Sequence, residues 1–165
     1  MRALAPFLLF TFLFTGCGYK PTAHFAKGVL GSKVSVSVDI HAVDPENTVI
    51  IKDAILQALM TRFRVVTTEQ KFSLTHLDAK LQRVGESSIE FDENGYVIAK
   101  RITTTIAITR YTKGVKKSYN VSGLYDFTIE PNATVSDTDR FKAIKEASLK
   151  AIDALIVKLA VEGSM

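Results

Sequence analysis

One cysteine and a group of four cations are the residues with the most distinctive chemistry in this 165-residue chain. Cys17 is the only cysteine, so neither a disulfide nor a cysteine-based metal cluster can form within one chain. The four cations fall within eight residues: Arg110, Lys113, Lys116 and Lys117. Tyr111 and Tyr119 accompany them. A positive turn flanked by aromatic rings can bind phosphate groups through charge-assisted hydrogen bonds, but the same charges could simply keep a hairpin tip soluble.

The residues before Cys17 predict an export signal. Arg2 precedes an apolar run from Ala3 to Phe14, which is the order of a charged region and an apolar region in a signal peptide. The run is shorter than the 20 or so apolar residues that a membrane-spanning helix requires. A buried core helix is the alternative, but the run offers no polar face. We therefore assign residues 1–16 to a signal peptide.

The junction at the cysteine resembles the lipobox of bacterial lipoproteins. In Phe14–Cys17 an apolar residue and two small residues precede the thiol. The resemblance implies that Cys17 is acylated, with chains such as palmitate, and becomes the first residue of the mature protein. Gly18 in place of Asp implies sorting to the outer membrane, on its periplasmic side. We expect 17–32, with Pro21 among them, to be a lipidated terminus and tether, and 33–163 to be one domain.

The elements that position the cations follow from periodicity. Alternating apolar and polar residues predict a strand over 33–41, and Asp44-Pro45 is typical of the start of a helix, which we expect to reach Phe63. Three long strands are expected next, joined by turns at Asn94-Gly95 and Lys113-Gly114, with a bulge near Arg83–Gly85. Ser136-Asp137 predicts the start of a closing helix of roughly 24 residues.

This order, βαβββα, predicts an α+β fold: a two-layer sandwich with a four-stranded sheet and two helices on one sheet face. The other face should then be polar and largely uncharged. Its expected residues are Ser35, Ser37, Thr103, Thr105, Thr109, Asn120, Ser122 and Thr128.

Catalytic and metal-binding patterns are missing from the sequence. The histidines at 24, 41 and 76 are scattered, and no nucleophile, phosphate-loop or dinucleotide motif occurs. Glu86, Glu90, Asp92 and Glu93 fit a solvated hairpin end better than a cation site. The net charge of +4 is too small for a nucleic-acid-binding surface. We expect no enzyme activity, no cofactor, no metal and no nucleic-acid partner.

Three short stretches resemble the lipopolysaccharide-assembly lipoproteins of the LptE family, in particular the branch of Campylobacter and Helicobacter. They are Cys17–Pro21, Asn94–Ala99 and Ser122–Asn132. The resemblance implies a protein that plugs the lumen of the LptD outer-membrane barrel, assists assembly of that barrel and binds lipopolysaccharide. It also implies that basic residues of the sheet contact the lipid. By position these are Lys100, Arg101, Arg110, Lys113, Lys116 and Lys117.

A second interpretation belongs to another class. Auxiliary lipoproteins of lipid-transport ATPases or of cell-wall synthases also carry small α/β domains on an acylated cysteine. An anchored periplasmic enzyme is a third and weaker alternative, because the motifs that it requires are missing.

Overall fold

The computed structural model describes residues 22–39, 45–130 and 135–164. The predicted signal peptide, Cys17 and the predicted helix-capping Asp44 lie outside these residues. The described elements, in chain order, are α2 (Thr22–Leu30), β1 (Lys33–Asp39), α3 (Pro45–Thr61), β2 (Val66–Thr67), the 3₁₀ helix η1 (Gln70–Phe72), β3 (Thr75–Phe91), β4 (Val97–Thr112), β5 (Val115–Thr128) and α4 (Asp137–Ser164).

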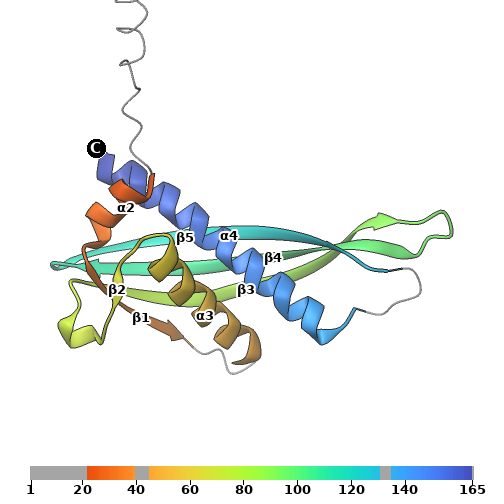
Figure 1. Cartoon of the computed structure of the whole chain (residues 1–165), viewed down its shortest axis with the longest axis horizontal. Coiled ribbons are helices and arrows are strands. Elements are labelled where there is room, and N and C mark those ends of the chain that lie inside the picture. The colour runs from red at the N-terminus through yellow and green to blue at the C-terminus, as the bar shows by residue number, and fades with distance from the viewer. Residues whose placement is uncertain (1–21, 40–44, 131–134, 165) are drawn as a thin grey trace, which may run out of the picture.

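The strands form one mixed, curled sheet in the order β2-β1-β3-β4-β5 (Figure 1). β1 runs parallel to both of its neighbours, because α3 makes the crossover that a parallel pair requires. β3, β4 and β5 form two long antiparallel hairpins.

The predicted fold class is wrong: the described chain has a five-stranded sheet and three α-helices, not four strands with two helices on one face. The fifth strand, β2, has two residues, which pair with Lys33 and Val34 of β1. So short a strand has no alternation to detect. Its pairing depends on the path of the chain after α3.

The third helix, α2, occupies residues that we assigned to the tether. Ala26 and Leu30 of α2 are fully buried, and the helix packs against α4. The packing is close, because a Cβ at Gly163 of α4 would lie 2.7 Å from the carbonyl oxygen of Phe25. The folded unit therefore includes α2.

The two hairpins have different regularity. β4 has 16 residues, a length of roughly 50 Å. Its pairing with β5 is uninterrupted from Thr112↔Val115 to Ala99↔Thr128. Its pairing with β3 has irregularities between Leu81 and Arg83 and between Ser88 and Phe91, so a bulge does occur near the expected place. The chain turns at both predicted places. Lys113 and Gly114 both have positive φ, whereas at the other turn Gly95 does and Asn94 does not, so that turn is not the expected two-residue type.

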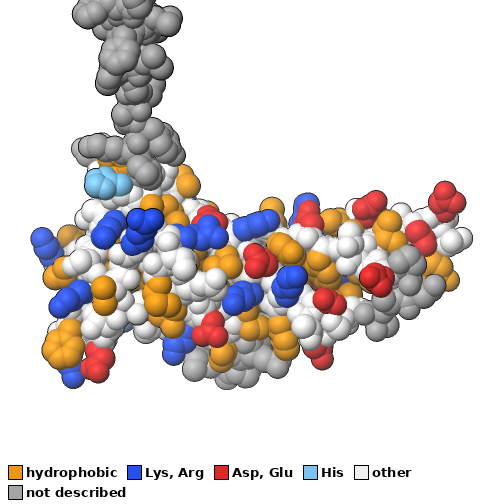
Figure 2. Space-filling model, viewed as in Figure 1, with side chains coloured by type: hydrophobic (Ala, Val, Ile, Leu, Met, Phe, Trp, Pro, Cys, Tyr) orange, Lys and Arg blue, Asp and Glu red, His pale blue; other side chains and the backbone are white. Residues whose placement is uncertain are grey.

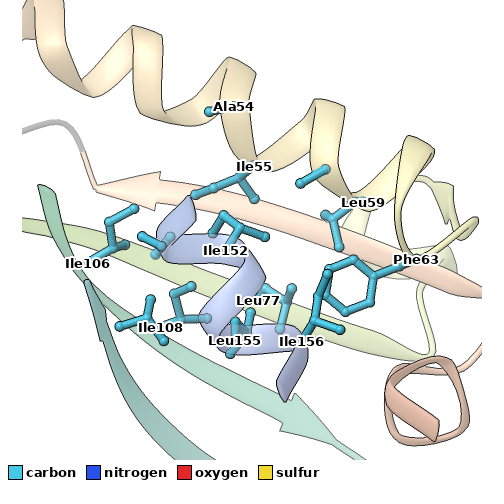
Figure 3. Packing of buried hydrophobic residues seen from close by; sticks show 14 of the residues in the cluster. Ala54, Ile55, Leu59, Phe63, Leu77, Ile106, Ile108, Ile152, Leu155 and Ile156 are labelled. Atoms are coloured by element: carbon cyan, nitrogen blue, oxygen red, sulfur yellow. The ribbon is translucent and has the colours of Figure 1, made fainter. Parts of the chain in front are cut away.

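The main core lies between the sheet and helices α3 and α4 (Figure 3). Ile55 and Leu59 of α3 and Ile152 of α4 are at most 2% exposed. Each such side chain contributes about 1.5–3 kcal/mol by its burial. At Gly123 of β5 the backbone of α4 comes so close that a Cβ would lie 2.0 Å from the carbonyl oxygen of Ala147.

None of the helices in the described part of the chain combines the length and the apolar character that crossing a membrane demands.

Candidate functional site

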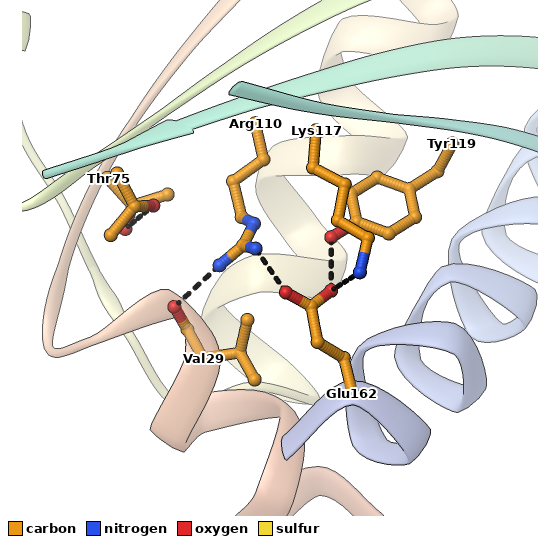
Figure 4. Close-up of polar contacts among 7 residues, drawn as sticks. Val29, Thr75, Arg110, Lys117, Tyr119 and Glu162 are labelled. Carbon is orange, nitrogen blue, oxygen red and sulfur yellow. Dashed lines mark hydrogen bonds and ion pairs between the residues drawn. The ribbon is translucent and has the colours of Figure 1, made fainter. Parts of the chain in front are cut away.

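The structure divides the predicted basic residues between the two faces of the sheet. Arg110 of β4 and Lys117 of β5 are register partners, and both side chains turn toward α4 (Figure 4). Arg110 donates to the Glu162 carboxylate and, over 3.2 Å, to the carbonyl oxygen of Val29 in α2. The Lys117 Nζ lies 3.1 Å from the other Glu162 oxygen. Arg110 is 6% exposed, so it cannot meet an external ligand.

Tyr119 completes this network around Glu162. Its hydroxyl donates to the carboxylate over 2.6 Å. Burial and this hydrogen bond raise the pKa of Tyr119 to about 12. For Glu162 burial alone would raise the pKa. The hydrogen bonds from Tyr119 and Lys117, with the charges of Arg110 and Lys117, outweigh burial and lower it. The ionised carboxylate therefore fastens the end of α4 to β4 and β5.

Lys100 and Arg101 also form ion pairs with other residues of the domain, and their side chains lie on opposite faces of the sheet. The Lys100 Nζ lies 2.6 Å from Glu86, which Arg140 of α4 approaches at 3.6 Å. Arg101 binds both oxygens of Asp126, at 2.6 and 2.7 Å. This bidentate pair lowers the pKa of Asp126 and raises that of Arg101.

Lys113 and Lys116 remain available. Lys113 stands in the β4–β5 turn, and both residues are exposed. The Lys116 Nζ lies 5.6 Å from the ring centroid of Tyr111. Neither lysine forms an ion pair with another described residue. Of the six predicted lipid-contacting cations, these two lie together at one end of the sheet with free charge.

The sheet face that Lys116 shares is polar, and none of the described α-helices covers it. Its hydroxyls pair across β4 and β5, Thr105 with Ser122 at 3.0 Å and Thr109 with Ser118 at 3.1 Å. We call this surface the open face. Its residues are those predicted for the polar face. Ser35 is the exception in exposure: it is only 3% exposed, because β1 lies beside the η1 segment.

A shallow hollow on the open face was missed from the sequence. Ser37, Gln70, His76, Asp78 and Tyr111 line its volume of about 390 Å³. The His76 ring shares hydrogen bonds with Ser35 at 2.8 Å and Ser37 at 3.1 Å. The alternation of β3 could have placed His76 on this face. Its neighbours come from β1, β4 and η1, and sequence spacing does not show that.

Within residues 22–39, 45–130 and 135–164, no three His, Cys, Asp or Glu side chains are grouped so that they could hold a metal ion. The expectation that the chain is not an enzyme stays a prediction.

Among known proteins, the chain is similar to solved structures in fold. No protein-family model matches the chain, and no curated protein matches it. Among solved structures, the rare lipoprotein B of Shewanella oneidensis matches with a TM-score of 0.50 and 12% identity over 80% of this chain and 96% of that chain. A protein from Xanthomonas campestris matches with a TM-score of 0.51 and 9% identity, over 81% and 85% of the two chains. The chain thus has the fold of a known lipoprotein.

Proposed function

We propose that this chain is an outer-membrane lipoprotein, acylated at Cys17, that plugs and helps to assemble the LptD barrel and binds lipopolysaccharide during its delivery to the cell surface. The fold shared with a Shewanella lipoprotein supports the lipoprotein part of this proposal. The sequence resemblance to the lipopolysaccharide-assembly lipoproteins supports the rest.

The open face is the observation that carries the proposal. It runs along strands of 16 and 14 residues, and its hydroxyl pairs leave few charges to desolvate when a partner covers it. The charges of Arg101 and Asp126 on this face already neutralise each other. A polar, weakly charged surface of this length fits the polar interior of a large outer-membrane barrel.

Lys113 and Lys116 are the residues proposed to meet the lipid. Lipopolysaccharide carries phosphate groups, and a lysine ammonium binds phosphate as a compact point charge. Arg110, Lys117, Lys100 and Arg101 hold the domain together through Glu162, Glu86 and Asp126. Their proposed role is to position β4 and β5, and no bond is made or broken in the lipid.

A purification from detergent-solubilised outer membranes tests the proposal. Full-length tagged protein should retain a large β-barrel in equal amount, and mass spectrometry should find acyl chains on Cys17. The variant Thr105→Arg/Ser122→Arg, which introduces two charges on the open face, should lose the barrel. Met60→Arg is the matched control, because Met60 lies on α3, 54% exposed, away from the open face. Recovery of ATPase subunits or a cell-wall synthase in place of the barrel would favour an auxiliary lipoprotein and contradict the proposal.

A further inference from the structure

A second basic surface lies at the same end of the domain as the β4–β5 turn, but on its helical side, where the described chain begins (Figure 1). A groove of about 420 Å³ separates α2 from the end of α3. The residues that line it include His24 and Lys27 from α2, Thr61 at the end of α3, and Arg62, Phe63 and Arg64 directly after it. In Figure 2 the cations gather on the half of the molecule that carries α2, and the acids gather at the far end.

The charges of this groove are mostly unneutralised. Arg62 pairs with Asp153 of α4. Lys27 and Arg64 are exposed and form no ion pair with any residue that the structure describes. The groove therefore has positive charge that an external anion can meet, and Phe63 closes its floor as a buried side chain.

Arg64 stands where a glycine would be favoured. Its φ is +51°, just after α3, and the next amide, that of Val65, donates back to the carbonyl oxygen of Leu59 over 3.3 Å. This is the left-handed position at which helices commonly end, and a side chain there is strained. Arg64 therefore makes this turn less stable than a glycine would, so Arg64→Gly removes the guanidinium without an expected loss of stability.

Acylation of Cys17, as proposed above, would place this groove at a membrane. α2 begins five residues after Cys17, and five residues of extended chain reach at most about 18 Å. An acylated Cys17 would therefore hold the α2 end of the domain within the headgroup layer or directly above it.

We propose that the groove between α2 and α3 binds the phosphate of anionic phospholipid headgroups in the leaflet that holds the Cys17 acyl chains. The inference rests on the acylation in the proposed function, but not on the barrel. Lys27 and Arg64 supply the positive charge. Arg62 also lines the site and keeps its ion pair with Asp153 of α4. With the acyl anchor, this contact gives the domain a second point of attachment and so fixes its orientation on the membrane.

Full-length mature protein in vesicles tests the inference. Because acylation consumes the Cys17 thiol, Met60→Cys gives a single labelling site beside the groove. Its fluorophore should be quenched by headgroup-attached quencher in vesicles of phosphatidylcholine with phosphatidylglycerol, and much less in phosphatidylcholine alone. Lys27→Gln and Arg64→Gly should each lower the ratio of docked to undocked protein about fivefold in the mixed vesicles.

Two controls make the outcome decisive. Lys142→Gln/Lys145→Gln removes two cations at the far end of α4 and should leave the quenching unchanged. Arg64→Gly relieves the backbone strain, so its melting temperature should not fall, and loss of docking cannot be unfolding.

Equal quenching in both kinds of vesicle, or quenching in both groove variants equal to that of the parent protein, would overturn the inference while leaving the barrel proposal intact. If inorganic phosphate raises the melting temperature of the parent protein but not of the groove variants, while quenching is equal in both kinds of vesicle, the groove binds free phosphate and the inference is overturned. A mass spectrum without acyl chains would overturn both proposals. With acyl chains present, a missing barrel in the outer-membrane purification would overturn only the proposed function.

Discussion

Lys116 and Lys117 are neighbours in the sequence, but their charged groups lie on opposite faces of the sheet. Successive side chains of a strand alternate. Lys117 therefore meets Glu162 of α4, whereas Lys116 lies over the ring of Tyr111 on the open face. Of these two adjacent lysines, Lys117 therefore forms a structural ion pair, and Lys116 keeps a charge that a ligand can meet.

The first prediction separates these two lysines. Lys113→Glu/Lys116→Glu should weaken binding to lipopolysaccharide micelles about tenfold or more, because two favourable phosphate contacts become repulsive. Lys117→Gln should leave the affinity unchanged, since that side chain faces Glu162. Titration of fluorescent lipopolysaccharide measures both. Equal weakening by the two variants would mean that the lipid contacts the helix-covered face.

The second prediction concerns the close approach of β5 and α4. Gly123→Ala should lower the free energy of unfolding by about 2–4 kcal/mol, because the added Cβ would overlap the backbone of α4 and force the two elements apart. Gly28→Ala is the matched control. It lies in α2 with no atom within 4 Å of the added Cβ, and should stabilise by about 0.5–1 kcal/mol. Urea unfolding distinguishes the two signs.

The third prediction removes the carboxylate that joins α4 to the sheet. Glu162→Ala should destabilise by about 3 kcal/mol, since Arg110 keeps its charge in a buried place without a partner. Lys117→Met should change stability by less than about 1 kcal/mol, because its side chain is 49% exposed. Similar losses from both variants would contradict the assignment of Arg110 as the buried partner.

The fourth prediction is a pH dependence at the alkaline end. The pKa of Tyr119 is raised from 10.0 to about 12, so its neutral form stabilises the fold below pH 10, and that contribution is lost as the pH rises toward 12. Between pH 10 and 12 the melting temperature of Tyr119→Phe should therefore fall less steeply with pH than that of the parent chain. Tyr96→Phe, at a tyrosine that is 70% exposed in a hairpin turn, should follow the parent curve.

The same network predicts a loss at the acid end. The lowered pKa of Glu162 means that its charged form stabilises the fold above the ordinary glutamate pKa of 4.5, and that stability is lost as the pH falls below it. Glu162→Gln should flatten the acid limb of the same unfolding curve.

The long elements could be predicted from the sequence, because each has a local signal. β4 and β5 alternate over many residues, and the turns at Gly95 and Gly114 require a positive φ that these residues adopt easily. α2 and β2 have no such signal. α2 is stabilised by burial of Ala26 and Leu30 against α4, a contact across more than 100 residues of chain.

The site was only partly accessible to sequence reasoning. The alternation of side chains along β5 predicts that Lys116 and Lys117 lie on opposite faces. It does not show that Glu162, near the end of the last helix, forms ion pairs with both Lys117 and Arg110. The groove at Arg64 was missed because its cations belong to segments more than 30 residues apart.

The unequal regularity of the two hairpins affects how copies of the chain can associate through the edges of their sheets. β3 pairs with β1 only as far as Lys80, so the rest of its outer edge is open to another strand, but its register shifts would break any straight ladder. β5 is the opposite edge of the sheet, and its pairing with β4 has no register shift. On that edge the Lys158 ammonium donates to the carbonyl oxygen of Asn120 and so occupies one backbone acceptor. We therefore expect copies of the chain to pair along β5 rather than along β3, and Lys158 to oppose that pairing at Asn120.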